Sequence, residues 1–519
     1  MSVSEEPSTR TQLTTACPLD CPDGCSLSVT VEGDTITKID AVPHGEAANP
    51  LTDGWICRKV RRMTRRIHGD ARLTTPLRRV GPKGSGQFEP ITWDEALDLV
   101  AERLRTADPS AVVPYLYNSS ATVFEQGGLT PLLFEALGAA LVEETICAAT
   151  SGKAWRLVFG TMPSADPTDV ADSDLIVVWG GNPTVSNSHL APRIEARAKE
   201  GAKVVVIDPR RTPAADRATR HLPVRPGTDV VLAMAAAAEL ERRGAIHRAF
   251  VDEHAEGVDE YLAACAQWTL ARAADVCGLS EADVSGFVDD LVGASAPLLR
   301  LGWGMERNRN GGSAHRAASS LWVLLGGFGR PGAGVVGSTG PKEDPTGGSV
   351  RRAVLGDVPH PNRRIVNMNR FGAVLHGEGG PVSVLLVQGS NPAATAPNQA
   401  LVQAGLARED LFTVVHDQVL TDTARFADVV LPATTSFEVD DIVAGYGGYW
   451  VQDAPAVIPP VGESRSNNQL AHGLAVRLGV EGDWDPSPAR LRELMVGPFE
   501  LPLRLQPEGF VQFRDVWPK

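Results

Sequence analysis

The chain of 519 residues lacks any apolar run of about 18 residues, which a membrane-spanning helix would require, so no membrane span is predicted. Its first sixteen residues contain neither an apolar segment nor a twin arginine, so no export signal is predicted and a cytoplasmic location is expected. Positive charge is not in excess either, since 49 Lys and Arg against 63 Asp and Glu give a formal net charge of −14. An acidic chain is a poor general binder of nucleic acid, so nucleic acid is not expected as a partner.

Cysteine is scarce, with seven in the chain, and four of the seven are crowded near the N-terminus. This is not the even scatter of a secreted disulfide scaffold, and in a cytosolic chain it indicates metal binding. Hydrophobic residues make up 43% and charged residues 22%, which excludes wholesale disorder. At roughly 100–200 residues per domain, the length predicts three or four domains.

The N-terminal cysteines have the spacing of a metal centre. Three of them lie in Cys17-Pro-Leu-Asp-Cys21-Pro-Asp-Gly-Cys25, and Cys57 follows after 31 further residues. The intervening SLSVTVEGDTITKIDAV alternates apolar and polar residues around a Gly turn, which predicts a β-hairpin that brings Cys57 back toward the other three. Four thiolates suit zinc or an iron–sulfur cluster. Three clustered cysteines and one distant cysteine are typical of a [4Fe–4S] centre, which we expect; structural zinc and unligated thiols are the alternatives.

The remaining cysteines, Cys147, Cys265 and Cys277, are dispersed along the chain. Cys265 and Cys277 lie in Ala-rich sequence that predicts helices, where a free cysteine behaves as a small buried residue.

A strand–turn–helix–strand pattern occurs twice in the body of the chain. The apolar run 174–179 leads into Gly180-Gly181-Asn182-Pro183, and after a helix the next strand, 203–207, ends at Asp208. In the second copy, 384–387 leads into Gln388-Gly389-Ser390-Asn391-Pro392, and the strand 411–415 ends at His416-Asp417. Continuous apolar strands are typical of parallel sheets buried on both faces, and ligands bind at the carboxyl ends of such strands. The pattern predicts an α/β fold.

The two turns have residue types that suit a nucleotide. Gly allows close approach of the backbone, Asn offers a donor and an acceptor, and a helix N-terminus favours phosphate. Neither turn is the G-x-G-x-x-G fingerprint, so an ordinary NAD site is not supported. The pairing indicates two similar nucleotides or one ligand with two arms; two tight turns without a ligand are the alternative.

In their order these motifs resemble the start and body of a molybdopterin oxidoreductase of the dimethyl-sulfoxide-reductase superfamily, to which formate dehydrogenases and assimilatory nitrate reductases belong. Besides the cysteines, the resemblance rests on Gly54-Trp55-Ile56-Cys57-Arg58-Lys59, the Arg-rich stretch after it and Ile91-Thr92-Trp93-Asp94-Glu95-Ala96, and it extends to about residue 480. It implies a small β-rich iron–sulfur domain and two α/β Rossmann-like lobes related by a pseudo-repeat. The expected divisions are 17–72 for the cluster domain, 73–140 with 338–440 for the second dinucleotide half, 141–337 for the first, and 441–519 for a C-terminal segment that returns to the cluster domain.

The resemblance also implies the cofactor and its ligands. Each half of such an enzyme holds one molybdopterin guanine dinucleotide, so we expect the bis-molybdopterin guanine dinucleotide form with Mo or W. The dinucleotide contacts implied here are Gly181, Asn182, Asp208, Arg210, Thr228, Asp229, Gly302, Gly389, Asn391, Asp417 and Thr423.

Two further roles follow from the resemblance. Cys147, the only thiol in the correct interval, would bind the Mo or W, with Ser151 as a weaker alternative ligand. The alternative role for Cys147 is that of a buried structural cysteine. Lys59, two residues after the last cluster cysteine, would assist electron passage between pterin and cluster. A surface lysine in a basic run is the alternative for Lys59.

Two departures from the family pattern affect the expected substrate and assembly. Formate dehydrogenases place His directly after the metal ligand and Arg shortly after a Gly-rich turn, but here Ala148 and the segment 336–339, without Arg, stand at those places. Formate therefore ranks below an unspecified small-molecule substrate. The family's C-terminal barrel would begin about where this chain stops, so a second chain that supplies it, a truncated product, or function without it are the alternatives.

The sequence thus predicts an enzyme: a molybdenum or tungsten oxidoreductase that passes electrons through a [4Fe–4S] cluster to an external electron acceptor or from a donor protein. One alternative is an electron-transfer or scaffold subunit that keeps the cluster but lacks the metal cofactor. The other is a non-redox hydratase built on the same cofactor.

Overall fold

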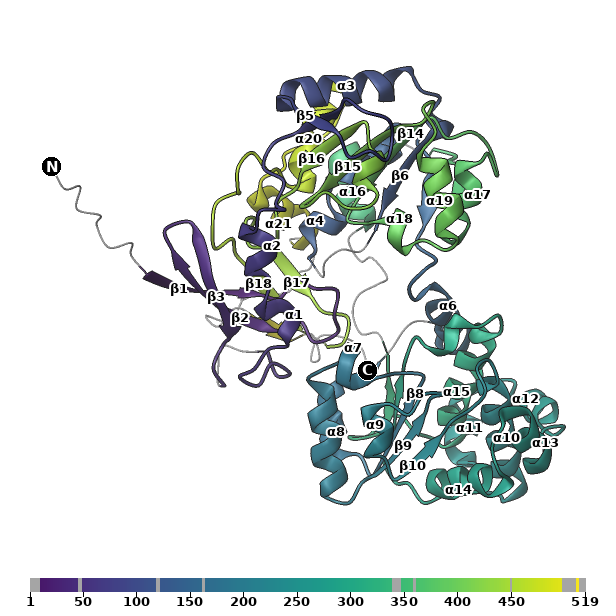
Figure 1. Cartoon of the computed structure of the whole chain (residues 1–519). Helices are drawn as coiled ribbons and strands as arrows, with labels where there is room; N and C mark the ends of the chain where they lie inside the picture. Colours follow the sequence, from purple (N-terminus) through teal and green to yellow (C-terminus); the bar gives the residue numbers. More distant parts are fainter. Residues whose placement is uncertain are drawn as a thin grey trace.

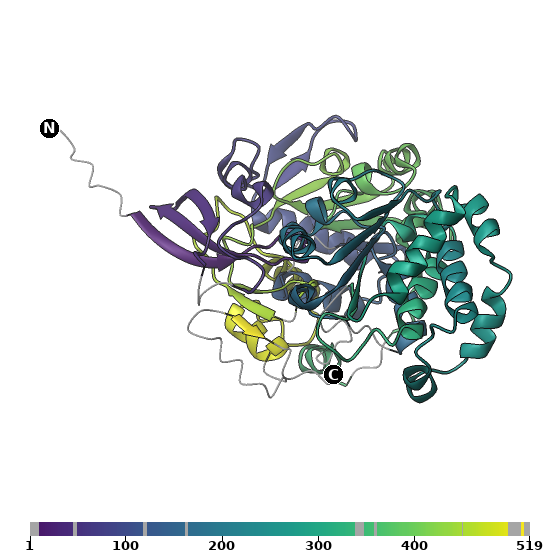
Figure 2. The same cartoon turned by 90° about the horizontal axis from the view of Figure 1, so that it is seen from below.

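The computed structural model describes residues 10–44, 49–117, 122–160, 164–337, 347–357, 361–448, 450–496 and 510–512. A small antiparallel sheet at the N-terminus adjoins two α/β lobes, each built on its own sheet (Figure 1). Seen from below, the N-terminal strands lie on the side of the molecule away from the helices of residues 229–292 (Figure 2). In these ranges no helix has both the length and the apolar character needed to cross a membrane.

The N-terminal domain is a three-stranded antiparallel sheet with two short helices. Its strands pair in the order β1 (Arg10–Ala16), β2 (Ser26–Glu32) and β3 (Thr35–Ala41). The predicted hairpin is β2–β3, and Gly33 takes the left-handed conformation, φ +60°, that its turn requires. Helices α1 (Arg58–Arg61) and α2 (Thr64–His68) contact β3 and bury Val60 and Ile67 in the core. This packing fixes the segment that follows Cys57.

The first lobe contains a five-stranded parallel sheet in the order β10-β9-β8-β11-β12. Its strands are β8 (Leu175–Trp179), β9 (Lys203–Ile207), β10 (Arg220–Leu222), β11 (Pro297–Leu301) and β12 (Gly334–Val336). Every residue of β8 is buried, as its continuous apolar run predicts. The helices of this lobe are α6 (Ala149–Phe159), α7 (Pro183–Ser186), α8 (Leu190–Lys199), α9 (Pro213–Asp216), α10 (Asp229–Arg242), α11 (Arg248–His254), α12 (Val258–Cys265), α13 (Leu270–Cys277), α14 (Glu281–Val292) and α15 (Gly311–Leu324). As predicted, Cys265 and Cys277 are buried on helices.

The second lobe contains a six-stranded mixed sheet in the order β5-β4-β16-β15-β14-β6. Strands β6 (Val112–Leu116), β14 (Val384–Gln388), β15 (Phe412–Asp417) and β16 (Val429–Pro432) are parallel, and β4 (Leu77–Arg79) and β5 (Phe88–Pro90) form an antiparallel edge. Its helices are α3 (Trp93–Thr106), α4 (Phe124–Gly127), α5 (Leu129–Ala136), α16 (Gly347–Leu355), α17 (Phe371–Leu375), α18 (Pro392–Thr395), α19 (Gln399–Leu406), α20 (Asn467–Leu478) and α21 (Pro488–Val496). Short 3₁₀ helices complete the two lobes: η1 (Pro109–Ala111), η2 (Pro167–Asp172), η3 (Met305–Arg307), η4 (Met368–Arg370) and η5 (Ala424–Phe426).

The segment that begins α3 carries its own start signal. Thr92 Oγ1 accepts from the backbone N of Glu95 at 3.2 Å, and the Glu95 carboxylate accepts from the backbone N of Thr92 at 2.8 Å. This capping box fixes the first turn of the helix. Trp93 then starts a buried face that packs against α20. The Ile91–Ala96 motif is therefore a helix start in this fold.

Two segments differ from the division expected from the sequence. The sequence pattern assigns residues 141–143 to the first lobe. In the structure they form β7 (Leu141–Glu143), which pairs in parallel with β13 (Ile365–Asn367), a strand from the part of the chain assigned to the second lobe. The C-terminal segment divides: the hairpin β17 (Asp441–Ala444) and β18 (Trp450–Ala454) contacts β1, whereas α20 packs on α3 and α5 of the second lobe. The short strand β19 (Phe510–Gln512) adds to β18. The sequence pattern is local and carries no signal for either pairing.

Candidate functional site

The four N-terminal cysteines are brought together by the hairpin. The backbone N of Cys17 donates to the carbonyl of Cys25 at 2.8 Å, and both side chains are buried. Burial raises the pKa of Cys17 and of Cys21 to about 12. The nearby thiol of Cys57 adds to the rise in the pKa of Cys17 and of Cys25, so the distant cysteine lies near these two.

This donor set fits an iron–sulfur cluster. In the part of the chain that the structure describes, no three His, Cys, Asp or Glu side chains are gathered closely enough to hold one metal ion. The thiolates of a [4Fe–4S] cluster instead surround a whole cluster, each bound to its own iron atom. Cys17, Cys21, Cys25 and Cys57 are the residues that would hold it.

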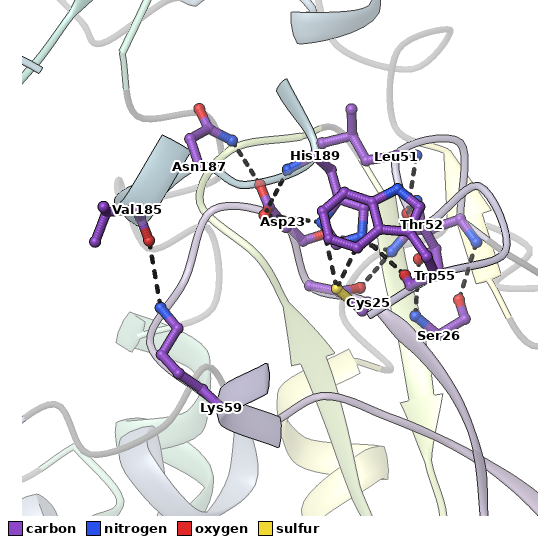
Figure 3. A network of polar contacts seen from close by, with 12 residues as sticks. Asp23, Cys25, Ser26, Leu51, Thr52, Trp55, Lys59, Val185, Asn187 and His189 are labelled. Atoms are coloured by element: carbon purple, nitrogen blue, oxygen red, sulfur yellow. Dashed lines mark hydrogen bonds and ion pairs between the residues drawn. The ribbon is translucent and has the colours of Figure 1, made fainter. Parts of the chain in front are cut away.

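Lys59 connects the cysteine loop with the first lobe. It lies on α1, the helix that begins directly after Cys57. Its Nζ donates to the carbonyl of Val185 at 3.5 Å (Figure 3). Val185 belongs to α7, the short helix that follows the first Gly-x-Asn-Pro turn. The positive charge of Lys59 also opposes the rise in the pKa of Cys17 and of Cys21, which places the ammonium near both thiols.

The two Gly-x-Asn-Pro turns have nearly the same backbone. Gly180 and Gly389 are both left-handed, with φ +64° and +62°, and each follows the last residue of a buried strand. Asn182 and Asn391 then precede α7 and α18 with φ/ψ of −119°/84° and −132°/69°. The equivalent of Gly389 is therefore Gly180, not Gly181. Aligning the two Asn-Pro pairs in the sequence would have identified Gly180.

The side chains of these turns are held differently. Oδ1 of Asn391 accepts from Thr423 Oγ1 at 2.7 Å, and Nδ2 of Asn391 donates to Asp422 at 3.3 Å. In the first turn, Oδ1 of Asn182 accepts from the hydroxyl of Thr184 at 2.5 Å. The structure thus brings together Asn391 and Thr423 of the predicted set.

Gly302, which follows β11, packs directly on the first turn. Its backbone N donates to the carbonyl of Trp179 at 2.8 Å, and a side chain at this position would overlap the backbone of Gly180 and Gly181. Glycine at 302 is therefore required for the close approach of two strand ends.

The remaining residues predicted to contact the dinucleotide in the first lobe form hydrogen bonds with other residues of this chain. Asp229, buried at the start of α10, accepts from Trp179 Nε1 at 2.9 Å, and burial raises its pKa. Thr228 Oγ1 donates to the carbonyl of Arg225 at 2.7 Å. Asp208 follows β9 and accepts from the backbone N of Arg210 at 2.8 Å. The Arg210 side chain is exposed.

In the second lobe, Asp417 ends β15, and burial raises the pKa of its carboxyl. Its Oδ1 accepts from the backbone N of Gln418 at 2.6 Å. Like the other predicted contacts at strand ends, it lies at the carboxyl end of a parallel strand.

Cys147 is half-buried in the loop between β7 and α6. Its thiol lies near two tyrosines: after burial itself, Cys147 is the main cause of the raised pKa of Tyr117, and it contributes to the raised pKa of Tyr446. Tyr446 also lies near Cys21, so one half-buried side chain is near both Cys147 and the cysteine loop. The sequence reasoning missed both tyrosines; Tyr446 has only its Gly-rich surroundings, Gly445-Tyr446-Gly447-Gly448, as a signal.

Ser151, the weaker alternative to Cys147, is engaged in the first turn of α6. Its hydroxyl donates to the carbonyl of Ala148 at 3.0 Å, and its backbone N donates to the carboxylate of Glu306 at 2.7 Å. Burial raises the pKa of that carboxyl. The Ser151 hydroxyl is therefore engaged within its own helix.

Comparison with known proteins places nearly the whole described chain. A family model described as molybdopterin oxidoreductase matches residues 72–477, and one described as molybdopterin oxidoreductase Fe4S4 domain matches residues 11–69. The "Probable oxidoreductase YoaE" of Bacillus subtilis is 34% identical over 469 residues, which are 89% of this chain and 68% of that protein. Staphylococcus aureus proteins named for formate dehydrogenase are 26% identical over 490 residues, and the match spans only 49% of their length. Acetylene hydratase from Pelobacter acetylenicus has the same fold, with a TM-score of 0.80 at 21% identity over 96% of this chain and 74% of that one.

Proposed function

The chain belongs to the molybdopterin oxidoreductase family and carries that family's Fe4S4 domain, and from this premise we propose a specific function for it. It is an oxidoreductase with a [4Fe–4S] cluster and a molybdopterin cofactor. The proposal is that the cofactor is bis-molybdopterin guanine dinucleotide with Mo or W, that it acts on a small molecule, and that electrons pass through the cluster to or from an external protein.

The paired turns support the two-armed form of the cofactor. Two strand ends in different lobes present the same left-handed glycine, Gly180 and Gly389, followed by an Asn in nearly the same conformation. A repeated backbone shape suits a ligand whose two halves are alike. Glycine at 302 lets the end of β11 pack directly on the first turn, so backbone contacts hold that turn in shape.

The contact between Lys59 and Val185 is the observation that carries the proposed electron path. Lys59 is two residues after Cys57, and its side chain contacts the helix that follows Asn182. One cation therefore lies between the cluster cysteines and the first dinucleotide turn. A cation at this place attracts an anionic cofactor and stabilises the reduced form of a neighbouring cluster.

Cys147 is proposed as the protein ligand of the metal. Its half-buried thiol lies in a loop near Tyr446, which itself lies near the cysteine loop. When bound, the metal would supply electron or oxygen-atom exchange with substrate, while the protein supplies placement. Ala148 beside Cys147 offers no proton-handling side chain, so a substrate other than formate is proposed.

The test of Cys147 does not depend on knowing the substrate. Wild type, Cys147→Ala and the control Cys277→Ala are purified without oxygen, and the sulfur coordination of Mo or W is measured by X-ray absorption. We expect Cys147→Ala to lose one sulfur ligand and keep its iron, and Cys277→Ala, altered on a buried helix position, to match wild type. Unchanged sulfur coordination in Cys147→Ala would reject the ligand assignment. A chain with a cluster but no pterin would establish the electron-transfer subunit instead.

A further inference from the structure

A buried contact between a histidine and an aspartate joins the cysteine loop to the first lobe. The Nδ1 atom of His189 lies 3.0 Å from Oδ2 of Asp23, and the two side chains are 1% and 2% exposed (Figure 3). The other ring nitrogen of His189, Nε2, lies 2.9 Å from the carbonyl of Trp55. Both ring nitrogens thus face oxygen atoms, so the ring is held from two sides.

The His189 ring is fixed in this place. It stacks on the indole of Trp55 with 3.8 Å between ring centroids and 22° between planes. Asp23 also accepts from Nδ2 of Asn187 at 2.5 Å and from the backbone N of His189 at 3.2 Å. Asn187 in turn accepts from the buried Arg300 at 3.1 Å. The segment between α7 and α8 therefore holds Asp23 with several donors.

The pair lies against a cluster cysteine. The Sγ atom of Cys25 is 3.7 Å from Nδ1 and 3.8 Å from Nε2 of His189. The charge of Asp23 contributes to the raised pKa of Cys17, Cys21 and Cys25, because a buried anion opposes further negative charge nearby. Reduction adds one electron, and so one negative charge, to whatever these sulfurs bind. An uncompensated Asp23 would therefore disfavour reduction.

We propose that the His189 ring, through its contact with Asp23 beside Cys25, offsets the negative charge of that carboxylate and thereby raises the reduction potential of the bound cluster. His189 is a positioning residue: it acts through Asp23 and Cys25 and belongs to a different domain of the chain from both. Partners in this outer layer are known levers on the potential of an iron–sulfur centre. The inference rests on the [4Fe–4S] part of the proposed function and does not require Mo, W or pterin.

The test is the midpoint potential of the cluster in the full chain, followed by electron paramagnetic resonance during titration with dithionite. His189→Phe keeps an aromatic ring on Trp55 but removes both ring nitrogens. We expect it to disfavour one-electron reduction at least tenfold, a fall of about 59 mV. His247→Gln is the matched control, because His247 is an exposed helix cap of the same lobe, and it should have the wild-type potential.

Asp23→Asn provides a second variant with the opposite expected sign. Removing the carboxylate charge should favour reduction, and combining it with His189→Phe should bring the potential back toward wild type, as expected for two coupled residues. Wild-type potentials in iron-loaded His189→Phe and Asp23→Asn would overturn the proposal, because a purely structural pair would leave the potential unchanged. If His189→Phe alone fails to retain iron, the double variant decides: a potential below that of Asp23→Asn supports the proposal, and an equal potential overturns it. A wild type with the cluster but without Mo or W would end the proposed enzyme function and still allow this titration to decide on His189.

Discussion

The hydroxyl of Thr423 donates to Oδ1 of Asn391 at 2.7 Å, and the backbone N of Thr423 donates to the same oxygen at 3.1 Å. Two donors on one oxygen fix the plane of the Asn391 amide. The NH₂ group of Asn391 is thereby directed toward the carboxylate of Asp422, 3.3 Å away. Thr423 thus orders the residue that we propose to contact the second dinucleotide.

Replacing Thr423 by Val should weaken cofactor retention. Val keeps the shape but removes the donor to Asn391, so the amide loses one of its two restraints and binding is less pre-organised. We expect several-fold less guanine nucleotide per chain after extraction, with the iron content unchanged. Thr106→Val, at the exposed end of α3 where Thr106 bonds only its own helix, is the control. Equal nucleotide in Thr423→Val and wild type would contradict the role of Asn391.

Replacing Lys59 by Ala should slow electron passage. The variant removes the cation between the cluster cysteines and α7, and loss of such an outer partner typically costs about 10–100-fold in activity. The measurement is the rate at which the dithionite-reduced enzyme is reoxidised by a one-electron acceptor in stopped flow. Lys38→Ala removes an exposed cation of the same domain, paired with Asp40 at 2.7 Å, and should leave the rate unchanged. A wild-type rate in Lys59→Ala would indicate an ordinary surface lysine.

Replacing Cys21 by Ala should cost the cluster and loosen the N-terminal domain, because metal binding and folding are coupled. Iron and sulfide per chain are measured, together with the rate of limited proteolysis. Iron should fall well below wild type and cleavage should become faster. Cys265→Ala, altered at a buried position on α12, should retain its iron. Full iron in Cys21→Ala would show that Cys21 is not a ligand.

The half-buried Glu125 and the buried Asp441 should make the second lobe less stable as pH rises. Burial and the neighbouring Asp441 raise the pKa of Glu125 to about 7, and burial raises the pKa of Asp441 to about 6. The folded state therefore holds protons that the unfolded chain releases at its ordinary pKa near 4. The stabilisation is present at low pH and is lost as pH rises through about 7.

Glu125→Gln tests this pH dependence. Between pH 5.5 and pH 8, wild type should lose about 2 kcal/mol of unfolding free energy through Glu125, a loss that the variant lacks. Urea unfolding at the two pH values measures both proteins. Because Glu125 also accepts from Nδ2 of Asn468 at 2.8 Å, the variant is expected to be less stable overall, and only the difference in pH slope is diagnostic. Equal slopes would contradict the assignment.

Much of the fold follows from local sequence patterns. The alternation around Gly33 predicts the hairpin, and the apolar runs at 174–179 and 384–387 predict two central strands, because both signals lie within one element. The α/β fold class and the oxidoreductase family are confirmed by the structure and the family models.

The contacts between distant segments could not be predicted in the same way. Asp23 and His189 are 166 residues apart, and no local sequence pattern around either residue predicts their contact. Tyr446 is likewise brought near Cys21 only because the β17–β18 hairpin packs against the N-terminal sheet. The roles of Cys147 and of the dinucleotide contacts remain predictions, since they depend on a cofactor that would bind these residues.

The most direct test of the central claim is the content of Mo, W, Fe and guanine nucleotide in the full chain purified without oxygen. The account predicts four Fe per chain, Mo or W at one per chain, and two guanine nucleotides released for each metal. An iron-loaded, folded chain that contains neither Mo nor W and releases no guanine nucleotide would contradict it.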